Sequence, residues 1–243
     1  MAAAPAVQLA PGVWRIPTMP RDLVNSFAFT DDDGQVTLVD CGLDKAPRRI
    51  VDGLAAIGKR PADVTRILLT HAHPDHAGGA AEMASRTRAP VAVHTDDRPH
   101  LVAGRPPPMD QDTALGRLFS RLPGSDRGFA GVSAPETLTD GQVLDVGGGL
   151  RVVHTPGHSP GHVSLLHEPS GVLVTGDALF NWRFAGIRFS PRPLCTNFRL
   201  SNRSAHELGE LDYSIAAFTH GPEIRDGARD AVRRFLSAHP LPP

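Results

Sequence analysis

The sequence has few of the residues that define several common protein classes. Only two of its 243 residues are cysteines, Cys41 and Cys195, and they form no CxxC pair. This excludes a disulfide framework and favours a reducing compartment. No apolar run approaches the roughly 18 residues that span a membrane, and the first residues lack the basic region of a signal peptide. We therefore expect a cytoplasmic protein with no membrane partner.

An excess of charge of one sign is also missing. The chain has 25 Lys and Arg against 26 Asp and Glu, which gives a formal net charge of -1. This balance provides no global electrostatic reason to bind nucleic acid or an anionic membrane, so we expect a small-molecule substrate. Lysine is scarce and arginine supplies nearly all the positive charge, which gives a single arginine little weight. The sequence leaves a homo-oligomer open.

Hydrophobic periodicity predicts mixed strands and helices along the whole chain. Helices are expected where apolar residues recur every three or four positions, at about 45–58, 77–88, 204–211 and 225–238. Strands are expected over the short apolar runs at 36–39, 66–70, 91–94, 143–146, 150–154, 163–167, 172–175 and 215–219. No linker divides this pattern. It predicts one α/β domain over residues 1–243, with two sheets inside and helices outside.

Residues 97–135 interrupt the regular pattern. They are rich in Arg, Pro and Gly, and they contain one short amphipathic stretch, around Thr113 to Leu122, that predicts a helix. A long segment with little regular structure inside a compact domain is usually functional or mobile. We interpret this segment as a lid or an insertion within the domain.

The stretch THAHPDHAGG, residues 70–79, contains four side chains that bind metals well. His71 and His73 are two positions apart at the end of a strand, so both can point the same way. Asp75 and His76 are adjacent, so a regular element cannot direct both side chains toward His71 and His73. In a turn, however, the two side chains can bind a metal at a second position. The motif therefore suggests two metal ions side by side.

Three further candidate ligands follow later strands. His158 in HTPGHSPGH, Asp177 in VTGDALF and His220 in FTHGP each stand beyond an apolar strand and near Gly or Pro. A lone histidine in such a place is usually an ordinary loop residue. Together with the first motif, however, the shared placement predicts that the strand ends meet at one edge. Imidazole and carboxylate groups favour zinc, with iron and manganese as alternatives.

These motifs resemble those of the metallo-β-lactamase superfamily, over roughly residues 13–238. The resemblance implies a four-layer αββα sandwich with the metals at one edge of the two sheets. It also implies two zinc ions per chain, with a bridging hydroxide as nucleophile and with Asp75 able to take or pass a proton. The implied ligands are His71, His73 and His158 for one ion, Asp75, His76 and His220 for the other, and Asp177 between both.

The implied activity is that of a dinuclear hydrolase in which metal-bound hydroxide attacks an ester, thioester or lactone. β-Lactamases of this fold lack a bridging aspartate at the position of Asp177, so antibiotic hydrolysis is not expected. The motifs are more similar to glyoxalase II-type thioesterases and acyl-homoserine lactonases. The alternative is a persulfide dioxygenase of the same fold, which uses one iron held by two histidines and one aspartate.

The stretch 179–203 directly follows Asp177, so we expect it to line or cover the site. Its arginines are interspersed with phenylalanines and one tryptophan, and it contains no acidic residue. One interpretation is a pocket wall in which Arg183 and Arg188 bind the carboxylate or phosphate of an anionic substrate, while Trp182 and Phe184 contact its apolar body. The other is a loop packed through its aromatic residues, or an oligomer contact.

A few other polar residues stand close enough in sequence to support the ligands. Asp40 could hold a ligand histidine through the free ring N–H of that histidine. His162 and His154 could play similar parts on either side of His158. Cys41 has no basic neighbour, and we interpret it as structural.

Overall fold

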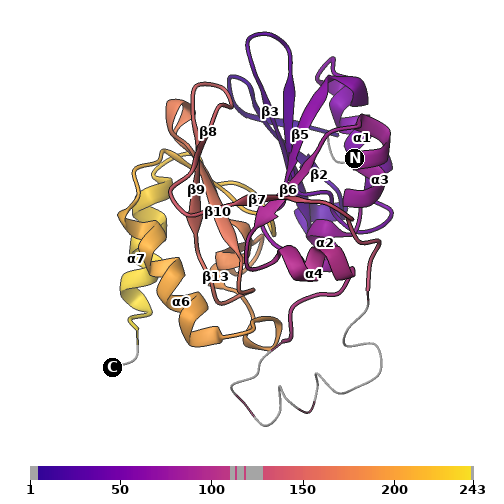
Figure 1. The fold of residues 1–243 in the computed structure, drawn as a ribbon. Coiled ribbons are helices and arrows are strands. Elements are labelled where there is room, and N and C mark those ends of the chain that lie inside the picture. Colours follow the sequence, from indigo (N-terminus) through magenta and orange to yellow (C-terminus); the bar gives the residue numbers. More distant parts are fainter. Residues whose placement is uncertain (1–4, 110–112, 114–117, 119–127, 242–243) are drawn as a thin grey trace.

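In the computed structural model, two β-sheets pack face to face and helices cover their outer faces (Figure 1). The structure describes residues 5–109, 113, 118 and 128–241. The first sheet has seven strands in the order β1-β2-β3-β4-β5-β6-β7, and the second has five in the order β14-β11-β10-β9-β8. The expected αββα sandwich is confirmed.

The amino-terminal half of the chain builds the first sheet. Its strands are β1 (Val7–Ala10), β2 (Val13–Pro17), β3 (Asn25–Thr30), β4 (Val36–Val39), β5 (Val64–Leu68), β6 (Val91–His94) and β7 (Glu136–Leu138). Strands β4 to β7 pair in parallel. The helices α1 (Pro47–Ala56) and α3 (Ala80–Thr87) lie in the crossovers from β4 to β5 and from β5 to β6. The carboxyl ends of β4, β5 and β6 therefore reach the same edge of the sheet.

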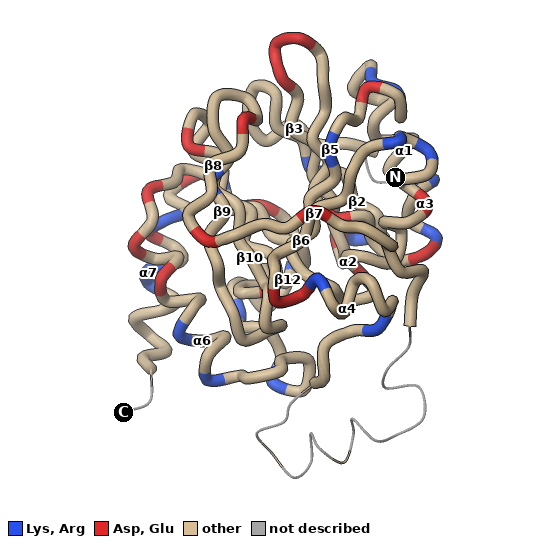
Figure 2. Tube along the Cα trace, viewed as in Figure 1, with Lys and Arg blue, Asp and Glu red and all other residues tan. Residues whose placement is uncertain are grey.

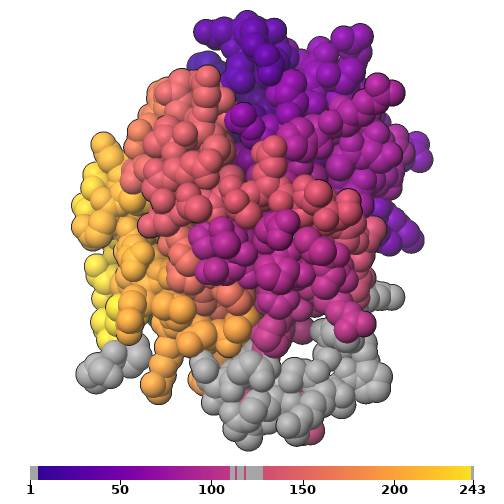
Figure 3. Space-filling model, viewed as in Figure 1, coloured from indigo at the N-terminus to yellow at the C-terminus, as the bar shows by residue number. Residues whose placement is uncertain are grey.

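The carboxyl-terminal half builds the second sheet and its helical cover. Its strands are β8 (Val143–Leu144), β9 (Leu150–His154), β10 (Val163–His167), β11 (Val172–Val174) and β14 (Ile215–Ala217), and its helices are α6 (Phe198–Glu207) and α7 (Ala228–Ala238). A separate hairpin, β12 (Leu179–Trp182) and β13 (Gly186–Phe189), was not expected from the sequence. The two halves lie against each other over the face seen in Figure 3.

Shorter elements complete the chain. These are α2 (Pro74–Ala77) and α4 (Arg98–Ala103), with the 3-10 turns η1 (Pro20–Asp22), η2 (Pro61–Asp63), η3 (Glu168–Ser170), η4 (Gly176–Ala178), η5 (Arg192–Leu194) and η6 (Leu208–Glu210). Among the described helices, none has the length and apolar character that crossing a membrane requires.

Three apolar layers hold the sandwich together. Ile50 and Leu54, four positions apart on α1, pack on the outer face of the first sheet. Phe27 belongs to the layer between the sheets, and Phe218 and Val232 to the layer under α6 and α7. Burying a large apolar side chain contributes about 1.5–3 kcal/mol. These layers hold the two sheets in place, and the loops that carry the metal-binding residues extend from the sheets.

Two expected helices begin and end differently in the structure. In place of the helix expected at 77–88, α2 ends at Ala77 and α3 begins at Ala80. Gly78 and Gly79 lie between them. A Cβ atom on Gly78 would overlap the carbonyl oxygen of Pro74, and a Cβ atom on Gly79 would overlap that of Cys41. The helix expected at 204–211 begins earlier, at Phe198, because the side chain of the preceding asparagine caps the backbone N–H of Leu200.

Part of the segment interpreted as a lid is well packed. Its beginning forms α4, and Leu101 of that helix is buried against the outer face of the first sheet. Phe129 and Val132 return to α4 through backbone hydrogen bonds to Gly104 and Leu101. The helix expected around Thr113 to Leu122 lies almost wholly outside the described residues, and the lid stays a prediction.

Candidate metal centre

The structure brings all seven predicted ligands together at one edge of the sandwich. His71 and His73 follow β5, and Asp75 and His76 lie on α2. The other three follow strands of the second sheet, His158 between β9 and β10, Asp177 in η4 after β11, and His220 after β14. Because both sheets direct these strand ends to the same side, segments far apart in sequence converge there.

The ring nitrogens of His71, His73 and His158 form a tight triangle. Nε2 of His71 lies 3.0 Å from Nδ1 of His73, which lies 2.8 Å from Nε2 of His158, and the two Nε2 atoms are 3.1 Å apart. A ring nitrogen either donates or accepts, so three of them cannot satisfy one another in a triangle. One cation satisfies all three, and tetrahedral zinc ligands lie about 3.3 Å apart.

A second group of ligands lies beside the first. Nε2 of His76 and Nε2 of His220 are 3.3 Å apart, and Oδ2 of Asp75 lies 3.7 and 3.5 Å from them. Asp177 contacts both groups. Its Oδ1 is 3.3 Å from Nε2 of His76, and its Oδ2 is 3.3 Å from Nε2 of His158. The carboxylate of Asp177 is therefore placed to bridge two ions.

Hydrogen bonds from behind orient several of these rings. The buried carboxylate of Asp40 accepts a hydrogen bond of 2.8 Å from Nδ1 of His76, as the sequence suggested. His220 donates through Nδ1 to the carbonyl of Leu23 at 2.6 Å. With Nδ1 protonated, Nε2 of each ring presents a lone pair to the centre, which is the form that binds a metal.

His162 also supports the centre. Its Nε2 accepts a hydrogen bond of 2.7 Å from the backbone N–H of Asp177, and its Nδ1 donates to the carbonyl of Thr155 at 3.0 Å. Burial lowers the pKa of His162 to about 4. His154, the other candidate, turns away and stacks on His94 with the ring centroids 4.0 Å apart.

Asp97 was missed as part of the site, because it stands at the start of the segment interpreted as a lid. Its buried carboxylate accepts hydrogen bonds from the backbone N–H of Ala72 at 2.8 Å, from Oγ of Ser159 at 2.7 Å and from the backbone N–H of Gly161 at 2.7 Å. It thus ties the loop of the first motif to the loop of His158. Only the folded chain reveals this, since an aspartate after a strand is common in sequences.

The electrostatics of the protein alone favour a cation. Burial raises the pKa of Asp177, but the neighbouring imidazoles of His220 and His76 outweigh burial and hold that pKa well below its usual range. Burial lowers the pKa of His71 and of His158, which keeps both rings neutral. Burial also lowers the pKa of His76 and of His220, but the carboxylate of Asp177 outweighs burial and raises the pKa of both rings. Without a metal these two rings therefore hold protons beside Asp177, and a divalent ion such as zinc would take the place of those protons.

A cavity of about 280 Å³ opens over the ligands. Besides five of the ligands, its wall is almost entirely apolar and consists of Pro74, Pro106, Met109, Phe180, Trp182, Pro191 and Leu194. Trp182 lines the cavity as predicted. Phe184 is fully exposed, Arg183 pairs with Asp22 at 3.0 Å, and Arg188 donates to the carbonyl of Ile187. These last three predicted residues do not line this cavity.

Comparisons with known proteins agree with this architecture. The family model of the metallo-beta-lactamase superfamily matches residues 19–234. The probable metallo-hydrolase YybB of Bacillus subtilis (strain 168) is 28% identical over 196 residues, which are 81% of this chain and 80% of that protein. A hydroxyacylglutathione hydrolase of Halorhodospira halophila is 32% identical over 162 residues, which are 67% of this chain and 46% of that protein.

A solved structure is similar over nearly the whole chain. It is a metallo-beta-lactamase family protein from Thermus thermophilus, with a TM-score of 0.72 and 28% sequence identity. The alignment covers 96% of this chain and 80% of that one. The similarity therefore extends over nearly the whole fold.

Proposed function

The chain belongs to the metallo-beta-lactamase superfamily, and on this premise we propose that it is a dinuclear zinc hydrolase acting on an ester, thioester or lactone. Metallo-hydrolases among its relatives support a hydrolase. The observation that carries the proposal is the position of Asp177, whose two carboxylate oxygens contact ligands of both groups. A site for one ion would not need that arrangement.

The residues fit two ions. His71, His73 and His158 would hold one ion, Asp75, His76 and His220 the other, and Asp177 would contact both. Two ions at such a site lower the pKa of water and polarise the substrate carbonyl. Iron or manganese could take the place of zinc, because the donor set includes carboxylates.

The protein's own residues have two further tasks. Asp75 lines the cavity and its side chain is 34% exposed, so its carboxylate is placed to accept a proton from water and pass it to the leaving group. Phe180, whose ring centroid is 4.4 Å from that of His220, and Trp182 form an apolar wall. This wall would bind the acyl part of the substrate and exclude water from it.

The relatives bear on the substrate as well. A relative named hydroxyacylglutathione hydrolase acts on a thioester by its name, which supports a thioester here. A mononuclear iron oxygenase of the same fold is the alternative. It needs two histidines and one aspartate, and the complete second group around His76 and His220 favours the hydrolase.

The test combines metal content with turnover. We expect about two zinc ions per chain in protein purified without added metal, and hydrolysis of at least one member of a panel of small thioesters, esters and lactones. Asp177→Asn should lower kcat at least a hundredfold and reduce the metal content. About one iron per chain, no hydrolysis, and oxygen uptake with a glutathione persulfide would replace the hydrolase with the oxygenase.

A further inference from the structure

The ligand His220 is oriented by a turn of the chain in which the backbone is strained. Nδ1 of His220 donates to the carbonyl oxygen of Leu23 at 2.6 Å. The two residues before Leu23, Arg21 and Asp22, both have left-handed backbone angles, with φ of 61° and 60°. Residues other than glycine rarely adopt this conformation, and it persists only where surrounding contacts hold it. The turn that carries the partner of His220 therefore depends on contacts outside the turn.

The buried side chain of Asp22 provides these contacts. Its Oδ1 accepts a hydrogen bond of 2.6 Å from Nη1 of Arg15, and its Oδ2 accepts one of 3.0 Å from Nη2 of Arg183. Burial raises the pKa of Asp22, but the two guanidinium groups outweigh burial and lower it. The backbone carbonyl of Asp22 accepts in turn from the backbone N–H of Gly221 at 2.7 Å. Asp22 is thus held by its side chain and binds the residue next to His220 through its backbone.

Arg15, on β2, joins the same turn to the chain beyond His220. Its Nε donates to Oε2 of Glu223 at 2.9 Å, and Glu223 stands three positions after His220. Charged positions are scattered over the helices and loops of both halves of the chain in Figure 2, but the side chains of Arg15 and Asp22 are only 6% and 7% exposed. Removing one partner of a buried ion pair leaves the other charge without compensation. The turn should therefore move when the charge of Asp22 is lost.

We infer that Asp22 is a positioning residue for the second metal ion, the ion that His76 and His220 would hold. The inference rests on the proposed dinuclear site. The carboxylate of Asp22 fixes the turn, and the carbonyl oxygen of Leu23 in that turn fixes the ring of His220. Nε2 of this ring then faces Oδ2 of Asp177 at 3.2 Å. Groups behind a ligand determine how well that ligand binds its metal, and here the controlling charge lies two contacts away.

The test measures the two metal affinities of Asp22→Asn, which keeps the shape of the side chain and removes its charge. Titration of metal-free protein with zinc against a chromophoric chelator gives both affinities, and His220→Asn identifies the one that belongs to the second ion. We expect Asp22→Asn to weaken the second ion about tenfold or more. The first ion should be unchanged, because Asp97 supports the loops of its ligands separately. Equal losses for both ions, or no loss for either, would overturn the inference.

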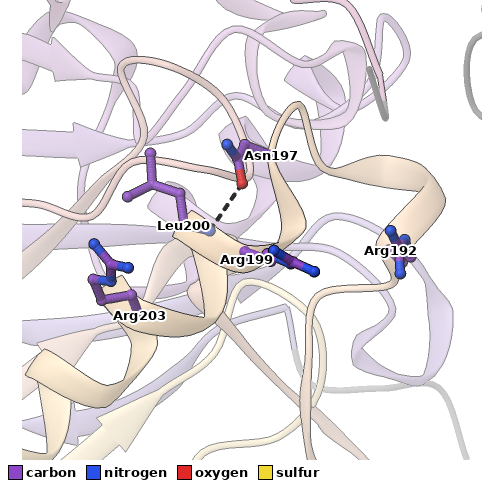
Figure 4. A pocket seen from close by; sticks show the side chains of 5 residues that line it. All are labelled: Arg192, Asn197, Arg199, Leu200 and Arg203. Atoms are coloured by element: carbon purple, nitrogen blue, oxygen red, sulfur yellow. Dashed lines mark hydrogen bonds between the residues drawn. The ribbon is translucent and has the colours of Figure 1, made fainter. Parts of the chain in front are cut away.

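Arg183→Gln keeps the inference testable if Asp22→Asn does not fold. The side chain of Arg183 is 59% exposed, so the fold should tolerate its loss. The second ion should then bind about two- to fivefold more weakly, because an exposed ion pair contributes less than a buried one. Arg199→Gln is the matched control, since Arg199 is also exposed but lies on α6 at the wall of another cavity (Figure 4). Identical affinities in these two variants would then argue against Asp22.

The ring proton of His220 separates this inference from the proposed activity. Because Nδ1 of His220 donates to Leu23, its proton should give a slowly exchanging resonance in ¹⁵N-labelled, metal-free protein. Asp22→Asn should make its exchange with water about tenfold faster by loosening the turn. If the wild type hydrolyses nothing or binds one ion, the dinuclear hydrolase fails, and faster exchange would still assign the positioning of His220 to Asp22. An unchanged exchange rate would remove that role.

Discussion

Asp97 and Ser159 are 62 positions apart, yet the carboxylate of Asp97 accepts a hydrogen bond of 2.7 Å from Oγ of Ser159. The same carboxylate also accepts from the backbone N–H groups of Ala72 and Gly161. One buried side chain thus sets the distance between the loop of His71 and His73 and the loop of His158. The geometry of the first metal position depends on it.

Replacing Asp97 should therefore weaken the fold and the metal centre together. Asp97→Ala leaves two buried N–H groups and one hydroxyl without acceptors, and we expect a loss of about 3 kcal/mol in the free energy of unfolding. Urea unfolding of metal-free protein measures this loss. Asp96→Ala is the control, because that neighbouring side chain is largely exposed. Equal stability of the two variants would contradict the role of Asp97.

Replacing Asp40 should lower metal affinity more than it lowers the stability of the fold. Asp40→Asn keeps the shape of the side chain but removes the charge that faces Nδ1 of His76. Outer partners of this kind typically change metal affinity by about 10–100-fold. We expect a loss of this size for the ion held by His76 and His220, measured by competition with a chromophoric chelator. An unchanged affinity for both ions would show that Asp40 does not act through His76.

Trp182 should determine which acyl groups are accepted. Trp182→Ala removes a large part of the apolar wall of the metal cavity. We expect kcat/KM for a thioester with a butyryl chain to fall about tenfold or more, and that for the acetyl thioester to fall much less, because the shorter chain loses less contact. Phe184→Ala, on a fully exposed position of the same hairpin loop, is the control. A uniform decrease for both chains would indicate a general disturbance of the site.

The stacked pair of His94 and His154 should make stability depend on pH. Burial and then the nearby His154 lower the pKa of His94, so the folded state favours the neutral ring. The unfolded state binds the proton more readily, and its histidine titrates near pH 6.5. The contribution of the neutral His94 ring to the free energy of unfolding is therefore complete above about pH 7, and it is lost as the pH falls below that value.

The variant His94→Asn tests this dependence. In the wild type, Nδ1 of His94 accepts a hydrogen bond of 3.3 Å from the backbone N–H of Asp96. The asparagine keeps a side-chain acceptor for that N–H. Between pH 7.5 and pH 5.5 the free energy of unfolding should fall less in the variant than in the wild type. Parallel losses in both proteins would assign the pH dependence to other groups.

Sequence patterns were most informative where a residue type has few alternative uses. HxHxDH with three later polar residues after strands predicted all seven converging side chains, and short apolar runs predicted the strands of the two sheets. The patterns were less informative for the arginines. Arg183 and Arg188 follow Asp177 closely in sequence, but neither lines the metal cavity. Arg183 pairs with Asp22, and Arg188 donates to the carbonyl of Ile187, so a part for either arginine in substrate binding stays a prediction.

The sequence by itself determined the chemistry of the centre, because imidazole and carboxylate groups keep their ligand character wherever the chain puts them. It also determined the strands and helices of the layers, since short apolar runs favour buried strands and apolar residues at every third or fourth position favour one face of a helix. Only the tertiary structure decided how loops meet. Asp97, which joins two ligand loops, and His162, which accepts from the backbone of Asp177, each contact residues distant in sequence. Such contacts follow from packing, which no local pattern encodes.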